Sequence, residues 1–315
     1  MLAFLFPGQG AQNVGMGRQL AERFAVCRET FEEADAALSM SLSALCFEGP
    51  EDRLMLTENT QPAILAMSVA VWRLAREHGI EARFAAGHSL GEYSAHVAAG
   101  TLSYADALRT VRRRGRYMQE AVPVGEGAMA AILGLDRDEV FRACAEIAAD
   151  TGRVVSPANL NAPGQVVIAG HADAVAAAGQ RARTLGAKRV IPLNVSAPFH
   201  CALMKPAEDR LTPDLRALDA KDPRIPVVAN VDAEPKRDAA AGIDALIRQV
   251  SAPVRWEEVV KRLVAEGVTT CLELGPGSVL AGLVKKINRD VTVLSIEDPD
   301  GFASALARLN EHANH

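Results

Sequence analysis

The sequence predicts an α/β protein in which helices cover a mostly parallel β-sheet and a second, smaller unit is inserted into the chain. Short apolar runs alternate with helical stretches along most of the sequence, an alternation typical of parallel sheets. Residues 126–194 follow a different element order, which indicates the inserted unit. With 315 residues, of which 49% are hydrophobic, the chain is long enough to bury a core in each unit.

The larger unit is expected to contain a series of strands, each a short apolar run, at residues 2–6, 83–86, 227–231, 271–274 and 291–296. Its clearest helical stretches are residues 60–78, 92–99, 104–121 and 256–266. Gly100, directly after the second of these, is typical of a helix C-terminus. Ligand sites in parallel sheets gather at the carboxyl ends of the strands, so a site is expected in the loops after residues 6, 86 and 274.

The inserted unit is expected to run strand, helix, strand, strand, helix, strand over residues 129–135, 137–149, 154–158, 165–170, 172–185 and 189–193. This βαββαβ order is typical of a ferredoxin-like unit. The Asn-Ala-Pro-Gly turn at residues 161–164 predicts a hairpin between the two middle strands. The expected boundaries are residues 125–195 for a ferredoxin-like subdomain, and residues 1–124 with 196–315 for a discontinuous larger domain.

Charge and hydropathy argue against two classes of protein. A net charge of −5 does not suit a nucleic-acid binder, because phosphate contacts need an excess of Lys and Arg on one face. The best apolar run, residues 63–72, is too short to span a membrane, and the first residues lack the basic start of a signal peptide. We therefore expect a cytoplasmic protein that binds neither nucleic acid nor membrane.

Five cysteines are scattered along the chain, at positions 27, 46, 144, 201 and 271. Their odd number excludes a complete disulfide framework, and no CxxC pair or Cys/His cluster indicates a metal site. The sequence thus predicts reduced thiols in a cytoplasmic protein and no bound metal.

The pentapeptide Gly-His-Ser-Leu-Gly at residues 87–91 lies between a predicted strand and a predicted helix. A serine flanked by glycines at such a bend is typical of a nucleophile elbow, in which a strained turn exposes the hydroxyl. The larger domain is therefore expected to be α/β-hydrolase-like, with Ser89 as the candidate nucleophile. The alternative is a glycine-rich turn in which the serine has no chemical role.

A serine hydroxyl needs a base to become a good nucleophile, and the chain contains seven histidines. His88 adjoins Ser89, but neighbouring residues at a strand end point to opposite sides, so we expect it to support the loop. His200 lies where the chain returns from the inserted unit to the larger domain, and it is the best candidate base. A lone loop histidine is often structural, and that alternative stays open.

Arg114 lies in a predicted helix whose apolar face is formed by Tyr104, Ala107, Leu108, Val111, Gly115 and Met118. At helical spacing Arg114 borders this face, whereas Arg113 and Arg116 point away from it. An arginine beside a buried face needs an anionic partner, and its planar fork suits a carboxylate. That partner is either an internal carboxylate or the carboxylate of a substrate.

The loop Gly8-Gln9-Gly10 follows the first predicted strand. No GxxxxGK[ST] motif is present, and the loop does not complete GxGxxG, so nucleotide binding is disfavoured. We instead expect the Gln9 N–H to face an oxyanion together with the N–H of Leu90.

Ordered motifs along nearly the whole chain resemble those of the malonyl-CoA:acyl-carrier-protein transacylases, a family of the acyltransferase superfamily. They are FPGQGAQ at residues 6–12, TQPA at 60–63, GHSLGEYSA at 87–95, RGRYMQEA at 114–121, ANLNAPGQVVIAG at 158–170, SAPFHCALM at 196–204, QVSAPVRW at 249–256 and ELGPG at 273–277.

The resemblance assigns roles to the candidate residues. It implies that Ser89 is acylated, that His200 is the general base and acid, and that the main-chain carbonyl of Gln249 orients His200. It further implies an oxyanion hole formed by the amides of Gln9 and Leu90, and Arg114 as the residue that binds the malonyl carboxylate. The further substrate-binding residues that it suggests are His88, Met118, Asn161 and Phe199.

The resemblance also implies a ping-pong reaction between malonyl-CoA and an acyl carrier protein, supplying fatty-acid synthesis with malonyl units. The bulky ring of Phe199 resembles malonyl-selective members of the family, where little room is left for a 2-methyl group. No cofactor beyond the two thioester partners is expected, and the chain is expected to be a monomer. The alternatives are a serine hydrolase or thioesterase, an acyltransferase that serves polyketide synthesis, and a carrier-docking module without activity.

Overall fold

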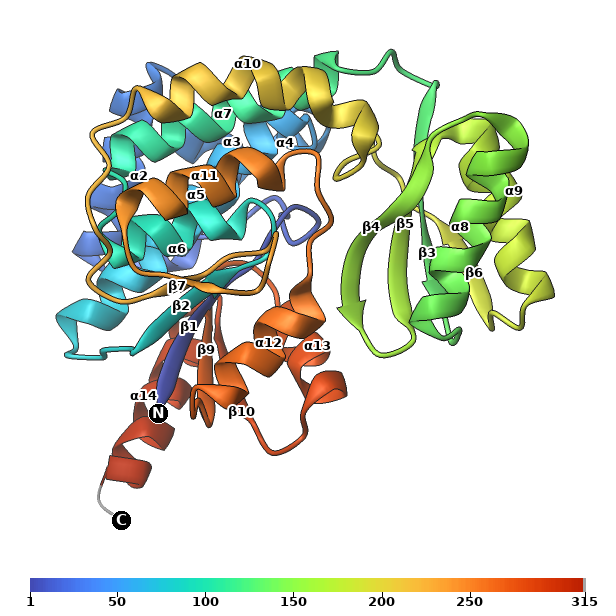
Figure 1. The fold of residues 1–315 in the computed structure, drawn as a ribbon. Coiled ribbons are helices and arrows are strands. Elements are labelled where there is room, and N and C mark those ends of the chain that lie inside the picture. Colours follow the sequence, from blue (N-terminus) through green and yellow to red (C-terminus); the bar gives the residue numbers. More distant parts are fainter. Residues whose placement is uncertain (314–315) are drawn as a thin grey trace.

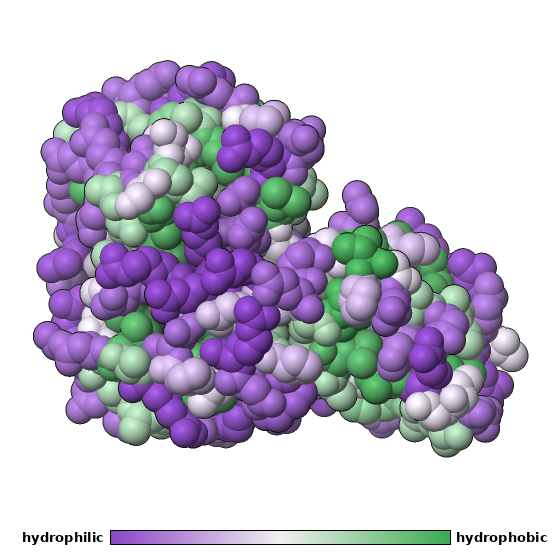
Figure 2. Space-filling view, turned by 90° about the horizontal axis from the view of Figure 1, so that it is seen from above, coloured by the Kyte–Doolittle hydropathy of each residue, from purple (hydrophilic) through white to green (hydrophobic). Residues whose placement is uncertain are grey.

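The computed structural model describes residues 1–313, and within them the chain forms two separate β-sheets (Figure 1). The larger sheet has the strand order β10-β9-β1-β2-β7-β8, and the smaller one has the order β4-β5-β3-β6. The two sheets belong to a larger and a smaller lobe that stand side by side with a notch between them (Figure 2).

The larger sheet is mostly parallel, as predicted. Its strands are β1 (Leu2–Phe6), β2 (Phe84–Gly87), β7 (Val227–Val228), β8 (Pro235–Lys236), β9 (Thr270–Leu274) and β10 (Thr292–Ile296). Only the short β8 is antiparallel to its neighbour. The strand expected at residues 227–231 ends early, because the chain turns at residues 230–232 and the Ala229 N–H donates to the carbonyl of Glu234 across this turn.

Helices cover both faces of this sheet. They are α1 (Arg18–Arg23), α2 (Ala25–Leu38), α3 (Leu42–Glu48), α4 (Glu51–Leu54), α5 (Thr57–Glu77), α6 (Gly91–Ala99), α7 (Tyr104–Glu120), α10 (Lys205–Arg216), α11 (Ala239–Gln249), α12 (Trp256–Ala265), α13 (Val279–Ile287) and α14 (Pro299–Ala313), with a 3₁₀ turn at Ala202–Met204. Phe4 and Phe6 of β1 pack into the core formed with α5, α6 and α7, whereas Ala3 and Leu5 pack into the core formed with α12 and α13. This alternation follows from the two-residue period of a strand.

The smaller lobe has the predicted βαββαβ order. It consists of β3 (Gly127–Leu133), α8 (Arg137–Thr151), β4 (Val155–Ala162), β5 (Gln165–His171), α9 (Ala172–Thr184) and β6 (Arg189–Pro192). The strands are antiparallel, β4 and β5 form the expected hairpin, and both helices lie on one face of the sheet (Figure 1). All of these elements fall within residues 125–195, and the boundaries themselves stay a prediction.

The edge strand β4 joins the smaller lobe to the larger one. The N–H of Leu160 donates to the carbonyl of Val254 at 2.8 Å, and the N–H of Val254 donates to the carbonyl of Ala158 at the same distance. These bonds form a parallel β-bridge between Asn159 of β4 and Val254, which lies just before α12. The bridge connects the edge of the smaller sheet to the larger lobe. None of the helices described in residues 1–313 is long and apolar enough to cross a lipid bilayer.

Candidate active site

Ser89 lies in the bend between β2 and α6, as the glycine pattern predicts. Its φ of 51° is in the left-handed region, which is unfavourable for a serine. A Cβ on Gly87 would lie 2.0 Å from main-chain atoms of Gly91, and a Cβ on Gly91 would lie 2.1 Å from the carbonyl oxygen of Phe6. The flanking glycines are therefore required by the close approach of three backbone segments at the elbow.

His200 contacts the serine directly. Its Nε2 lies 2.7 Å from the Ser89 Oγ, and its Nδ1 lies 3.0 Å from the main-chain oxygen of Gln249. Since a carbonyl can only accept, Nδ1 carries the proton and Nε2 is free to accept the serine proton. Burial, reinforced by the positive charge of Arg114, lowers the pKa of His200 to about 3, so the ring is neutral at physiological pH.

Arg114 is buried at the base of the same site, with 1% of its surface exposed. One terminal nitrogen donates to Gln61 Oε1 at 2.9 Å, and the other donates to Gln249 Oε1 at 2.9 Å and to Ser89 Oγ at 3.2 Å. Within residues 1–313 no carboxylate forms a salt bridge with this guanidinium, so of the two alternatives the internal ion pair is not formed. The arginine thus places a positive charge without a salt-bridge partner beside the nucleophile.

A cavity of about 580 Å³ opens onto Ser89, His200 and Arg114 between the two lobes. Gln9 and Leu90 line it, and neither main-chain N–H donates to a protein acceptor in the described part of the chain. Two free N–H groups beside a nucleophile are what an oxyanion hole requires. In residues 1–313 no group of three or more His, Cys, Asp or Glu side chains is placed to hold a metal ion.

The other predicted substrate contacts occupy different places. His88, Met118 and Phe199 line the cavity. Asn161 instead accepts a hydrogen bond from His88 Nε2 with its Oδ1, at 2.8 Å. The residue of β4 that lines the cavity is Asn159, two positions earlier. The pKa of His88 is lowered by burial, and its bond to Asn161 ties the elbow to the smaller lobe, which fits the expected supporting role.

Two buried residues at the site were not predicted. Asn230 follows β7, accepts the Ser89 N–H at 2.7 Å and donates to the Gly87 carbonyl at 2.7 Å. These two hydrogen bonds fix the backbone of the elbow. Gln61 on α5 anchors Arg114. A polar residue at the carboxyl end of the apolar run 227–231 was the one signal that could have identified Asn230.

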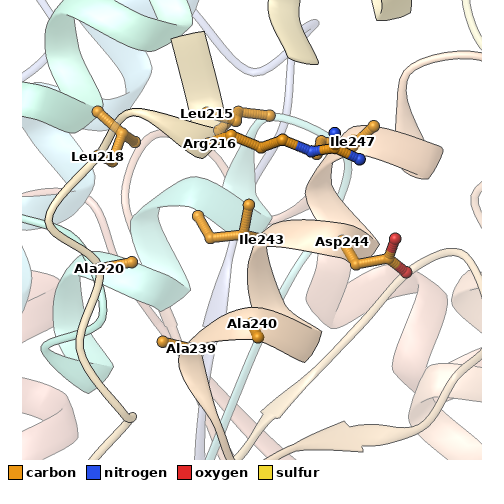
Figure 3. Close-up of a pocket in the computed structure, with 9 residues that line it drawn as sticks. All are labelled: Leu215, Arg216, Leu218, Ala220, Ala239, Ala240, Ile243, Asp244 and Ile247. Carbon is orange, nitrogen blue, oxygen red and sulfur yellow. The ribbon is translucent and has the colours of Figure 1, made fainter. Parts of the chain in front are cut away.

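A second cavity of about 450 Å³ lies between the end of α10 and α11. Its wall is mostly apolar, with Ile243 and Leu215 facing each other and the charged Arg216 and Asp244 at one side (Figure 3). None of the predicted site residues lines it. Ser89, His200 and Arg114 all line the cavity between the lobes, and none of them lines the second cavity.

Comparison with known proteins agrees with this geometry. The family model for the acyl transferase domain matches residues 3–301. The malonyl CoA-acyl carrier protein transacylase of Bacillus subtilis strain 168 is 51% identical over 310 residues, which cover 98% of each chain. The crystal structure of an acyl carrier protein S-malonyltransferase from Vibrio cholerae matches with a TM-score of 0.94 and 49% identity over 96% of this chain and 99% of that one.

A third match is the structure of a malonyl-transacylase in complex with a type II PKS acyl-carrier protein. Its TM-score is 0.95 at 49% identity, and it covers 98% of this chain and 99% of that one. The matches extend over nearly the whole length on both sides. This chain therefore belongs to the acyl transferase domain family and, within it, to the malonyl CoA-acyl carrier protein transacylases.

Proposed function

We propose that this protein transfers the malonyl group from malonyl-CoA to the phosphopantetheine thiol of an acyl carrier protein, through a malonyl ester on Ser89. The observation that carries the proposal is the contact of one hydroxyl with both a base and a cation: Ser89 Oγ lies 2.7 Å from His200 Nε2 and 3.2 Å from Arg114. The names of the relatives support the same activity.

The short distance between cation and nucleophile accounts for the substrate class. A single methylene separates the carboxylate of a malonyl group from its thioester carbonyl, so a site for malonyl must place its carboxylate partner directly beside the nucleophile. Arg114 meets this condition, and its neutral partners Gln61 and Gln249 leave its charge available to the substrate. In a longer dicarboxylic acyl group whose carboxylate is bound to Arg114, the thioester carbonyl would lie farther from Ser89.

In the first half-reaction His200 Nε2 takes the proton of Ser89 as Oγ attacks the thioester carbonyl carbon. The N–H groups of Gln9 and Leu90 stabilise the oxyanion that forms. When the C–S bond breaks, the imidazolium returns its proton to the CoA sulfur, and a malonyl-serine ester remains. The Gln249 carbonyl, which accepts the Nδ1–H, stabilises the imidazolium in the way a carboxylate does in a hydrolase triad.

The second half-reaction reverses these steps with a different thiol. His200 removes the proton of the carrier's phosphopantetheine thiol, the sulfur attacks the ester carbonyl, and Ser89 Oγ leaves with the proton from His200. Acyl transfer between a thioester and an ester needs no oxidant or reductant, which supports the expectation that no cofactor takes part.

We further infer a cytoplasmic location and a supply of malonyl units to fatty-acid synthesis. The five cysteines, all of them buried and free, support a reducing compartment. The match to a complex with a type II PKS carrier keeps polyketide synthesis as the alternative pathway. The monomeric state stays a prediction.

A serine hydrolase would use the same elbow and base, with water as the second acceptor. The buried Arg114, whose hydrogen-bond partners are uncharged, favours transfer of a substrate with a free carboxylate. Brief mixing with malonyl-CoA followed by intact-mass analysis should show one malonyl adduct in the wild type and none in Ser89→Ala. Addition of acyl carrier protein should then yield malonyl carrier in excess of free malonate. Release of malonate at the same rate with and without carrier would refute transfer.

A further inference from the structure

Glu92 is a fully buried carboxyl on the first turn of α6, three residues after the nucleophile. Its Oε2 accepts hydrogen bonds from the Gln249 side-chain amide at 2.8 Å and from the Asn230 main-chain N–H at 2.9 Å. The side chains of Glu92, Asn230 and Gln249 have no solvent exposure. The mechanism above assigns no role to this carboxyl.

Both hydrogen-bond partners of Glu92 also contact reacting residues of the site. Asn230 holds the Ser89 N–H and the Gly87 carbonyl. Gln249 donates to the Ser89 carbonyl at 3.0 Å, presents its side-chain oxygen to Arg114, and accepts the His200 Nδ1–H with its main-chain oxygen. Glu92 Oε2 is therefore connected to the nucleophile, the base and the cation through one intervening hydrogen-bonded residue in each case, either Asn230 or Gln249.

The chemistry of a carboxyl decides which way the Gln249 amide is oriented. An amide has a donor side and an acceptor side, and Arg114 must meet the acceptor side because a guanidinium only donates. Glu92 Oε2 and the Ser89 carbonyl oxygen accept from the Gln249 NH₂ on the opposite side, and together they leave the amide oxygen facing Arg114. Without this acceptor, the Asn230 N–H would be a buried donor without a partner, and the Gln249 NH₂ would lose the shortest of its three hydrogen bonds.

We propose that Glu92 is a positioning residue of this active site: by accepting from Gln249 and Asn230 it fixes the Gln249 amide against Arg114 and the Gln249 carbonyl against His200. The inference rests on the proposed acyl-serine chemistry. Burial raises the pKa of Glu92 to about 7, and a carboxyl oxygen accepts both hydrogen bonds whether or not its partner oxygen is protonated.

The test compares Glu92→Ala with the isosteric Glu92→Gln, which keeps an acceptor oxygen and removes the ionisable group. Ser94→Ala is the matched control, because Ser94 is equally buried on the same helix and its hydroxyl has no partner within residues 1–313. The readouts are the single-turnover rate of Ser89 acylation at saturating malonyl-CoA and the preference for malonyl-CoA over acetyl-CoA.

We expect Glu92→Ala to lower the acylation rate by about 10- to 100-fold, the range for loss of two buried hydrogen bonds, and to lower the malonyl preference as well. Glu92→Gln should stay within about threefold of the wild type, because its oxygen replaces the acceptor. Ser94→Ala should acylate and discriminate like the wild type.

A folded Glu92→Ala that acylates at the wild-type rate with wild-type preference would overturn the proposal, since the carboxyl would then serve stability only. Glu92→Gln as slow as Glu92→Ala would also overturn it, because charge rather than the acceptor would be the cause. If Glu92→Ala does not fold, Glu92→Asp, whose carboxyl is one methylene short, must show the loss. Absence of the ester in the wild type would instead refute the proposed function.

Discussion

Two of the reacting residues have a strained backbone. Four non-glycine residues within the described chain have a left-handed φ, and two of them are Ser89 at 51° and His200 at 59°. Each such conformation costs on the order of 1–3 kcal/mol and persists only where the surroundings impose it. At Ser89 this conformation is maintained by the hydrogen bond to Asn230 and by the close backbone approach that the flanking glycines allow. The strain directs both side chains into one cavity.

At the residue scale, Arg114 is expected to determine the acyl preference. Arg114→Ala should lower the ratio of kcat/KM for malonyl-CoA to that for acetyl-CoA by about 10- to 100-fold, because the carboxylate loses a charged donor. Arg113→Ala is the control, since Arg113 is its exposed neighbour on α7 and pairs with Asp214 outside the cavity. An unchanged ratio in Arg114→Ala would mean that another group binds the carboxylate.

His96 is expected to make stability depend on pH. It is fully buried, neither ring nitrogen has a partner in the part of the chain described, and burial lowers its pKa from 6.5 to about 4. Because the unfolded chain binds the proton first, the free energy of unfolding falls as pH drops from 6.5 to 4, by about 3 kcal/mol for this group. In His96→Leu this contribution should be absent.

The measurement is urea unfolding of the wild type and His96→Leu at pH 7 and pH 4.5. The variant should lose less free energy of unfolding between the two conditions. His88 and His200 also have lowered pKa values and are common to both proteins, so the difference between the proteins isolates His96. Equal losses in both proteins would show that His96 does not titrate in this window.

At the scale of elements, a glycine sets the distance between α5 and α7. A Cβ on Gly115 would lie 2.6 Å from the carbonyl oxygen of Thr57, closer than real Cβ contacts, whereas a Cβ on Gly282 in α13 would have no heavy atom within 4 Å. Gly115 directly follows Arg114, so this close packing of α7 against α5 also positions the Arg114 guanidinium in the site.

Gly115→Ala and Gly282→Ala should therefore change stability in opposite directions. The first should destabilise by about 1–3 kcal/mol through overpacking, and the second should stabilise by about 0.5–1 kcal/mol through helix propensity. Chemical denaturation of both variants measures this. Destabilisation by Gly282→Ala, or none by Gly115→Ala, would contradict the packing argument.

Long or strongly patterned elements were predictable from the chain. The strands β1, β2, β9 and β10 were expected within one residue of their observed ends, since each is a short, mostly apolar run. The short helices α1, α3 and α4 were not anticipated, because a helix of four to seven residues contains too few turns to show a period. Tertiary packing against α5 and its neighbours determines such elements. Several longer helices were also not among those expected, namely α2, α10, α11, α13 and α14.

At the scale of the whole molecule, two lobes face each other across the cavity (Figure 2). The hydrogen bond between His88 and Asn161 is a side-chain link between the elbow and the smaller lobe. Asn161→Ala should raise the KM for malonyl-CoA by about threefold to tenfold, the loss expected for one neutral hydrogen bond, with little change in kcat.

Ser156→Ala is the control for this prediction, since Ser156 is half-buried on the same strand β4 and lies outside the cavity lining. Steady-state kinetics with carrier protein in excess gives both constants. A fall in kcat at unchanged KM in Asn161→Ala would place His88 in the chemical steps instead.

The sequence by itself determined the α/β class, the βαββαβ insertion, the serine elbow, and the unusual position of an arginine beside an apolar helix face. These follow from periodicity and glycine spacing, which are local properties of the chain. Ser89 and Arg114 were singled out in this way, His200 was chosen among the seven histidines by its place after the inserted unit, and family resemblance supplied the carbonyl of Gln249.

Only the tertiary structure decided what surrounds them. Ser89 and Asn230 are 141 residues apart, and Glu92 and Gln249 are 157 residues apart, so no local pattern relates them. The neutral partners of Arg114, the bond from Asn161 to His88, and the buried carboxyl of Glu92 depend on how β7, α11 and β4 meet at the elbow. Hydrogen bonds between distant segments act over a few ångströms, and only the folded chain brings their donors and acceptors within that range.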